Sequence, residues 1–280
     1  MLVTLREVLD YAERNGCAVG AFNAPNLESL NAAVSAAEKY NVPVIISHAQ
    51  SHEQYSPLDV IGGIMVLVAK NAETNVCVHL DHCEDLDYMR RALEIGFTGV
   101  MYDGSALSYE ENAANTIKAV AMAKKFGAGV EAEIGQLASG EGGGKNSGGP
   151  VYTDPDTAAR FAGETGIDAL APSFGTAHGI YKSKPVLDIK RVAVIKQKTG
   201  LPLVMHGGSG VSAEDYRSAI AAGIRKINYY SYMAREGVTA VKKALGGDDV
   251  IYYHELALAA EKAMQAEVEK AMEVFYGRIF

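Results

Sequence analysis

Short apolar runs and helical segments alternate along almost the whole chain, and few architectures accommodate that order. Strand-like runs are predicted at residues 17–22, 43–47, 76–81, 99–102, 128–134, 167–172, 202–206 and 225–229. Helical patterns occupy residues 27–40, 57–72, 84–95, 108–126, 156–165, 187–199 and 213–222. Runs such as VIIS (44–47) and LVMH (203–206) do not alternate apolar with polar residues. That pattern is typical of parallel strands covered on both faces.

Eight strands with helices between them predict a (β/α)8 barrel (TIM barrel), a fold of about 250 residues. The chain has 280 residues and no shift in composition, so we expect residues 1–280 to form a single TIM-barrel domain. A doubly wound open sheet is the alternative. An additional C-terminal helix is expected over residues 253–276, where it would cover the barrel or contact a partner subunit. Its apolar stripe comprises Leu256, Ala260, Met264, Val268, Met272 and Phe275.

The composition limits the kinds of binding partner that we expect for this protein. The net charge is −8 and no basic cluster is present, so we expect no nucleic-acid partner. The longest apolar stretch, near residues 61–69, is too short to cross a bilayer, and the charged N-terminus is not a secretory signal. Three cysteines show no disulfide or metal spacing. We therefore expect a cytoplasmic protein with no membrane partner.

Three histidines, His82, His178 and His206, each follow one of the apolar runs. The carboxyl ends of barrel strands meet at one face, which is where TIM-barrel active sites lie. Neutral imidazole is a common Zn²⁺ ligand, and three protein ligands with one open position form the usual catalytic zinc site. The sequence thus predicts such a site. The alternative for each histidine is a hydrogen-bonding role in the core.

Three further motifs lie at the same predicted face. Asp81 directly precedes His82, and it can act as a general acid or base or can cap the next helix. The segment HGGSG (206–210), with residues 228–231 after the last strand, has the location of the barrel phosphate site. Residues 135–150 contain seven glycines and Glu141, and predict either an active-site lid or an inert loop.

Taken together, these motifs resemble the class II, metal-dependent ketose-bisphosphate aldolases, the fructose- and tagatose-bisphosphate aldolase family. The resemblance extends from about Leu5 to Ser231. It is carried by AFNAPNLE (21–28), AAEKYNVPVII (36–46), HLDH (79–82), GFTGVMYDGS (96–105), VEAEIGQ (130–136), TGIDALAPSFGTAHGIYK (165–182), LPLVMHGGSG (201–210) and GIRKIN (223–228).

The resemblance implies a role for each matching residue. His82, His178 and His206 would bind one catalytic Zn²⁺, and Asp103 and Glu133 would hold a second or displaced metal. Asp81 would transfer the proton of the aldehyde oxygen, and Glu141 would remove the α-proton. Substrate and phosphate contacts would come from Asn23, Ser47, Gly179, Gly207, Gly208, Ser209, Asn228, Tyr229, Tyr230 and Ser231.

The family also implies reversible cleavage of a sugar phosphate to dihydroxyacetone phosphate, or a similar ketone, and an aldehyde. A monovalent cation, Na⁺ or K⁺, would lie near the glycines, and the chain would form a homodimer or homotetramer. A metal-dependent hydrolase and a non-catalytic sugar-phosphate-binding barrel are the alternatives.

The chain departs from the family pattern in the expected substrate rim. His48 and Ala49 stand where the family commonly has other polar residues, and Tyr230 introduces a phenol beside the phosphate site. The lid motif reads ASGE (138–141). The family pattern does not identify which arginine would bind a second phosphate group. Arg235 and Arg278 are the two candidates. We therefore expect a ketose 1-phosphate, or an unusual bisphosphate, to be a better substrate than fructose 1,6-bisphosphate.

Overall fold

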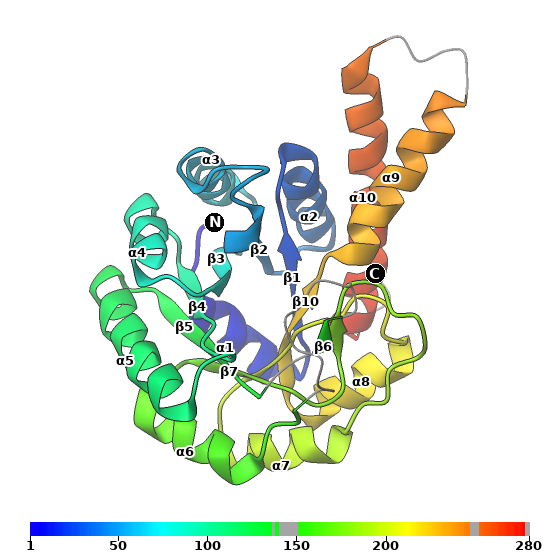
Figure 1. Cartoon of the computed structure of the whole chain (residues 1–280). Helices are drawn as coiled ribbons and strands as arrows, with labels where there is room; N and C mark the ends of the chain where they lie inside the picture. The colour runs from blue at the N-terminus through cyan, green and yellow to red at the C-terminus, as the bar shows by residue number, and fades with distance from the viewer. Residues whose placement is uncertain (136–137, 140–150, 247–251, 278–280) are drawn as a thin grey trace.

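Eight parallel strands close into a barrel in the order β1-β10-β9-β7-β5-β4-β3-β2. The computed structural model describes residues 1–135, 138–139, 151–246 and 252–277. The barrel strands are β1 (Val19–Asn23), β2 (Val44–Ala49), β3 (Val76–Cys83), β4 (Gly99–Tyr102), β5 (Gly129–Ile134), β7 (Ala169–Pro172), β9 (Leu203–Met205) and β10 (Ile224–Tyr229). Figure 1 shows the ring of helices around them. The closed sheet confirms the predicted barrel and excludes the open sheet.

The helices around the barrel begin and end where the local sequence predicts. They are α2 (Leu27–Tyr40), α3 (Leu58–Asn71), α4 (Leu86–Ile95), α5 (Tyr109–Phe126), α6 (Pro155–Thr165), α7 (Ile189–Thr199) and α8 (Ala213–Ala222). Asp154 caps α6 by accepting a hydrogen bond from the Thr157 amide, and Pro155 occupies the first turn. Helix α2 ends at Asn41, whose φ of 50° is left-handed.

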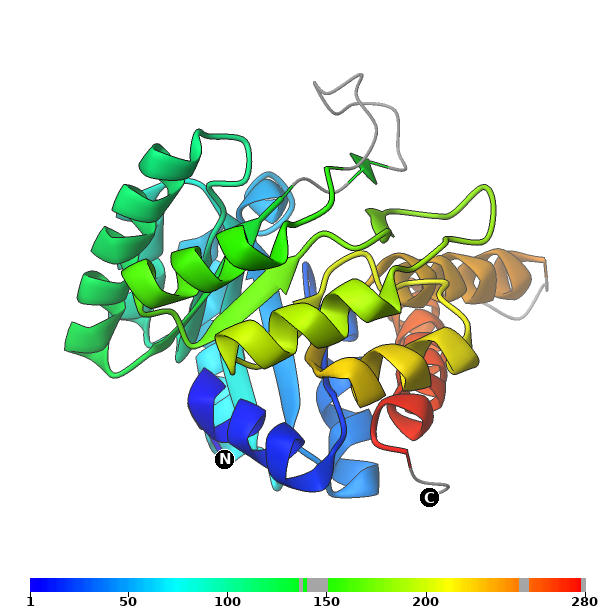
Figure 2. The same cartoon turned by 90° about the horizontal axis from the view of Figure 1, so that it is seen from below.

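Several elements were not individually predicted. Helix α1 (Leu5–Asn15) lies at the amino end of the barrel, where the Leu5 amide donates to Thr98 O at 3.2 Å. A 3₁₀ turn, η1 (Gln50–His52), follows β2. Two short strands, β6 (Ala138–Ser139) and β8 (Ala177–His178), pair outside the barrel. Figure 2 shows β6 and β8 on the opposite side of the molecule from the N-terminus.

Helices α9 (Ser231–Leu245) and α10 (Tyr253–Phe275) form an antiparallel hairpin that extends away from the barrel (Figure 1). The far end of α10 packs on the barrel, where Phe275 O accepts a hydrogen bond from the Ala18 amide at 3.0 Å. This confirms the expected C-terminal helix. Among the described residues, no helix is long and apolar enough to cross a membrane.

Candidate active site

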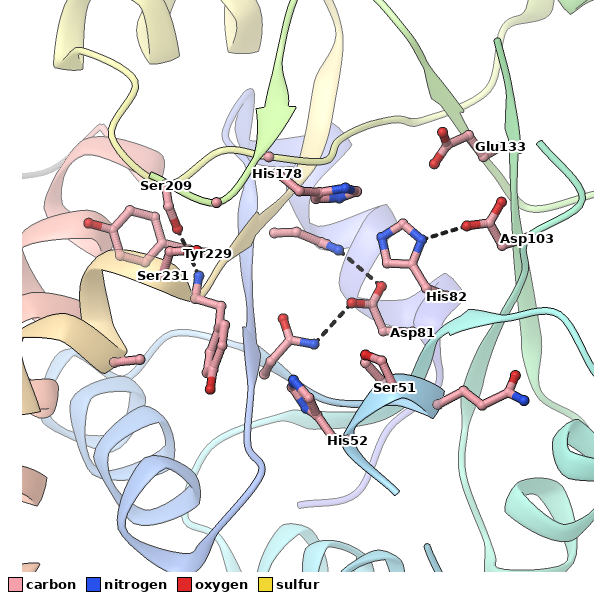
Figure 3. Close-up of a pocket in the computed structure, with 18 of the residues that line it drawn as sticks. Ser51, His52, Asp81, His82, Asp103, Glu133, His178, Ser209, Tyr229 and Ser231 are labelled. Carbon is pink, nitrogen blue, oxygen red and sulfur yellow. Dashed lines mark hydrogen bonds and ion pairs between the residues drawn. The ribbon is translucent and has the colours of Figure 1, made fainter. Parts of the chain in front are cut away.

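A cavity of about 930 Å³ opens at the carboxyl ends of the barrel strands. Its volume lies in the range of small-molecule sites, about 300–1,000 Å³. Figure 3 shows Asp81, His82 and His178 close together in it, with Asp103 and Glu133 on one side. Of the predicted substrate residues, those that line the cavity are Asn23, Gly179, Gly207, Ser209, Asn228, Tyr229, Tyr230 and Ser231.

A backbone irregularity at the end of β3 brings Asp81 and His82 to the same cavity. Neighbouring strand residues normally point to opposite faces. Here the pairing of β3 with β4 shifts register between Leu80 and Cys83, and His82 has a left-handed φ of 44°. A non-glycine residue with this φ is uncommon and is typical of functional sites. The bulge explains how consecutive side chains both line the cavity.

The three histidines converge. The ring centres of His82 and His206 lie 4.4 Å apart, and that of His178 lies 4.8 Å from His82. His206 Nδ1 is 2.8 Å from His82 Nε2. Each of the three rings contributes one nitrogen, and these three nitrogens all lie within 4.8 Å of one another. His82 and His178 line the cavity, while His206 lies buried behind them. The predicted three-histidine cluster therefore exists in the fold.

His178 reaches the cluster by a different route from the one predicted. It is not at the end of a barrel strand, because β7 ends at Pro172 and His178 lies in the separate strand β8. The Tyr181 hydroxyl holds this strand in place: it accepts from the Ala177 amide and donates to Gly207 O, both at 2.8 Å. A Cβ at Gly207 would lie 2.3 Å from Ala177 O. Gly207 is therefore required for the close approach of β8.

Carboxylates bind the outward nitrogens of two of these histidines. His82 Nδ1 lies 2.7 Å from Asp103 Oδ2, and His206 Nε2 lies 2.7 Å from Glu131 Oε1. Metal-ligating histidines almost always contact a carboxylate or carbonyl through the second ring nitrogen. Three imidazole nitrogens within 4.8 Å of one another, two of them on rings held by carboxylates, thus fit a metal ion.

The electrostatics of the site also favour a cation. Burial lowers the pKa of His82, but the carboxylates of Asp81 and Asp103 outweigh this effect and raise the pKa to about 10. Burial and the neighbouring Asp103 raise the pKa of Glu133 well above its usual range. His82, Asp103 and Glu133 form a second group whose ligand atoms lie within 4.8 Å of one another. The predicted positions of Asp103 and Glu133 are therefore compatible with a second metal.

Asp81 is held by two amide donors. Asn23 Nδ2 donates to one carboxylate oxygen and Asn228 Nδ2 to the other, each at 3.0 Å. Burial raises the pKa of Asp81, but the positive charges of His82 and Lys226 outweigh it and hold the pKa well below its usual range. Asp81 does not cap the next helix, because Asp85 accepts the amides at the start of α4. The helix-cap alternative is thereby excluded.

Three predicted substrate residues do not present the expected polar group to the cavity. Ser47 is completely buried in β2 and does not line the cavity. Gly208 also lies outside the lining, and its amide donates to Asn228 O at 3.2 Å. The Tyr229 hydroxyl points to α10, where it donates to Glu267 at 2.7 Å. Ser47 and Gly208 are therefore not among the residues that line the cavity, and the Tyr229 hydroxyl is directed to α10; their substrate contacts stay predictions.

The substrate rim is also built differently from the prediction. His48 is completely buried, with Nε2 2.9 Å from the Tyr88 hydroxyl, and does not line the cavity. The lining comes instead from Ala49 and from η1, whose His52 ring centre lies 5.4 Å from that of Tyr230. Tyr230 therefore belongs to the rim as predicted, and His48 does not.

Of the two candidate arginines, Arg235 lies within the described part of the chain. The guanidinium of Arg235 lies over the Tyr232 ring at 4.1 Å, and Arg235 does not line the cavity. Arg278 lies outside the described residues, as does Glu141 of the predicted lid.

Sequence reasoning assigned no role to a buried layer beneath the histidines, formed by His79, Glu131 and Lys226. Strand periodicity could have revealed part of it. Lys226 lies two residues before Asn228, and Glu131 lies two before Glu133, so each pair shares one strand face.

Comparisons with known proteins agree with this geometry. Residues 3–278 match the family model of class-II fructose-bisphosphate aldolase. A fructose-bisphosphate aldolase of Staphylococcus aureus (strain Mu50 / ATCC 700699) is 37% identical, over 90% of this chain and 88% of that protein. A sulfofructosephosphate aldolase of Alkalicoccus urumqiensis is also 37% identical, over 96% of this chain and 95% of that protein.

A solved structure gives the same result. The crystal structure of the YdjI aldolase from Escherichia coli K12 superposes with a TM-score of 0.88 at 32% identity, covering 98% of this chain and 97% of that one. The family match spans nearly the whole chain, and the fold and the histidine cluster agree with it. This chain therefore belongs to the class-II fructose-bisphosphate aldolase family and is a lyase of the aldolase type.

Proposed function

We propose that this protein is a Zn²⁺-dependent aldolase that reversibly cleaves a ketose phosphate to dihydroxyacetone phosphate, or a similar ketone, and an aldehyde. The observation that carries the proposal is the position of Asp81. Its carboxylate is fixed by Asn23 and Asn228 directly beside the three-histidine cluster. An ionised carboxylate at this position can accept a proton from a substrate hydroxyl.

Each part of the site then has a task. His82, His178 and His206 would hold Zn²⁺, which when bound supplies Lewis-acid polarisation of substrate oxygens. Asp81 accepts the hydroxyl proton as the carbon–carbon bond breaks, and it returns that proton in the condensation direction. By the family resemblance, Glu141 exchanges the α-proton of the ketone fragment.

The start of α9 supports a phosphate site at one end of the cavity. Its N-cap residue, Tyr230, makes no side-chain capping hydrogen bond to the first turn. Tyr230, Ser231 and Ala234 line the cavity there, together with Gly207 and Ser209. A helix N-terminus presents amide donors and the positive end of the helix dipole, both of which favour an anion. We therefore place the phosphate of the ketone fragment against this turn.

The direct test is aldehyde release from ketose phosphates by the zinc-loaded protein. We expect release that is abolished by a chelator and restored by added Zn²⁺. A hydrolase would instead release inorganic phosphate from the same compounds without a new aldehyde. A binding protein would retain the sugar phosphate unchanged. Chelator-resistant aldehyde release would contradict the zinc requirement.

The lining also supports the substrate prediction. Within the described part of the chain, no lysine or arginine lines the cavity, and η1 contributes Gln50, Ser51 and His52. A second phosphate would there meet neutral polar groups and Glu84 instead of a cation. We therefore propose a ketose 1-phosphate as the preferred substrate, cleaved with a kcat/KM at least tenfold above that of fructose 1,6-bisphosphate.

A substrate panel measures this preference. It should contain the 1-phosphates and 1,6-bisphosphates of fructose and tagatose. It should also contain a sulfofructose phosphate, because one relative carries that substrate in its name. The proposal is refuted if fructose or tagatose 1,6-bisphosphate ranks first by tenfold or more in kcat/KM. Inactivity on every compound would count against the aldolase proposal itself.

A further inference from the structure

Lys226 is a lysine buried completely in the middle of the barrel. It lies on β10, beneath the cavity, and does not line it. Lysine is rarely buried in full unless its charge is paired. Here Nζ forms an ion pair with Glu131 Oε2 at 2.8 Å and donates a hydrogen bond to Asn228 Oδ1 at 2.7 Å. One partner of Lys226, Glu131, contacts the histidine cluster, and the other, Asn228, contacts Asp81.

One branch leads to the histidine cluster. Glu131 binds Lys226 through one carboxylate oxygen and His206 Nε2 through the other, at 2.7 Å. An ionised carboxylate can only accept, so Nε2 of His206 must carry the ring proton. The other nitrogen, Nδ1, then presents its lone pair toward His82 Nε2 at 2.8 Å and Asn228 Nδ2 at 3.2 Å, on the side where the proposed metal would bind. The ion pair therefore selects which nitrogen of His206 can bind a metal.

The other branch leads to Asp81. An ammonium group is a donor only, so the oxygen of the Asn228 amide must face Lys226. That orientation turns Asn228 Nδ2 toward Asp81 Oδ1, at 3.0 Å. Without Lys226 the amide could rotate and present its oxygen to the Asp81 carboxylate, which would be repulsive. The same lysine thus determines the donor that Asp81 receives.

We propose that Lys226 is a positioning residue that orients His206 for metal binding, through Glu131, and Asp81 for proton transfer, through Asn228. The proposal rests on the zinc-dependent aldol cleavage proposed above. It adds that one buried cation, remote from the substrate, links the metal site to the acid–base group.

Two variants test the proposal. Lys226→Met removes the charge at similar length, and Lys226→Met/Glu131→Gln removes both charges, so that no unpaired ion is left in the barrel. In each folded variant we expect Zn²⁺ affinity, measured by competition with a chelating dye, to fall about 10- to 100-fold. The visible spectrum of the Co²⁺-loaded protein should change. At saturating metal, kcat should fall at least tenfold with little change in KM.

Arg225→Met is the matched control. Arg225 is the neighbouring residue on β10, but its guanidinium pairs with Glu13 on α1 at 2.9 Å, away from the cavity. This variant should keep the metal affinity, the Co²⁺ spectrum and kcat. A folded double variant with unchanged metal affinity and Co²⁺ spectrum would overturn the proposal, whatever its thermal stability.

A measurement on the unmodified protein covers the case in which neither variant folds. Nitrogen-15 NMR of zinc-loaded protein labelled in histidine should show the His206 proton on Nε2 and the metal on Nδ1. A proton on Nδ1 would overturn the proposal. Metal affinity and ring protonation are measured without substrate, so tight metal binding with no aldehyde release would refute the aldolase function separately.

Discussion

A His206→Ala variant is expected to lose its zinc and nearly all of its activity. His206 Nδ1 lies 2.8 Å from His82 Nε2, so its removal takes away one of the three proposed ligands. It also removes the ring nitrogen that lies 2.7 Å from Glu131 Oε1, while the ion pair of Glu131 with Lys226 remains. Loss of an outer-shell partner alone costs about 10- to 100-fold in metal affinity, and loss of a ligand should cost more. Zinc content after dialysis, together with kcat, measures the effect.

His254→Ala provides the control for this variant. His254 is an exposed histidine on α10, and its ring stacks on Tyr252 at 5.4 Å, away from the cavity. Its replacement should leave zinc content and kcat unchanged. Stoichiometric zinc bound to His206→Ala with unchanged affinity would show that His206 is not a ligand.

An Asp81→Asn variant is expected to keep its metal and lose aldol cleavage. The amide preserves the size of the carboxylate but cannot accept and return a proton. The expected loss in kcat is therefore about 10²- to 10⁴-fold, the usual contribution of general acid–base catalysis. The new amide also faces the Nδ2 donors of Asn23 and Asn228, so one oxygen acceptor is lost. Single-turnover cleavage and zinc content distinguish this from loss of the metal.

Asp85→Asn is the matched substitution outside the site. Asp85 caps α4, and asparagine caps a helix about as well as aspartate. This variant should retain both stability and turnover. If Asp81→Asn cleaved its substrate at nearly the normal rate, Asp81 would have only a structural role.

The barrel could be predicted because its signals are local. A strand covered on both faces requires a continuous apolar run. Both β2 and β9 are buried along their length and contain such a run. Helix ends depend on residues such as Asp154 and Asn41, which act on their own turns. Helix α9 gave no comparable signal, since it begins at Tyr230 without a side-chain cap.

The active site could be predicted only in part. Asp81 and His82 lie beside each other in sequence, so their shared motif was informative. Their common orientation depends on the bulge in β3, which pairing with β4 creates. Ser47 and His48, which do not line the cavity, and Tyr229, whose hydroxyl is directed to α10, all lie near strand ends. A shift of one residue there turns a side chain from the cavity to the outer layer.

The sequence by itself determined the strand and helix order, the barrel class and the residue types available for metal and proton chemistry. These follow from apolar periodicity, capping residues and the side chains themselves. Only the tertiary structure decided that His178 arrives on β8, that Gly207 makes room for it, and that Lys226 joins Glu131 to Asn228. Those relations link strands far apart in the chain. Their distances depend on barrel closure and packing, which no local pattern encodes.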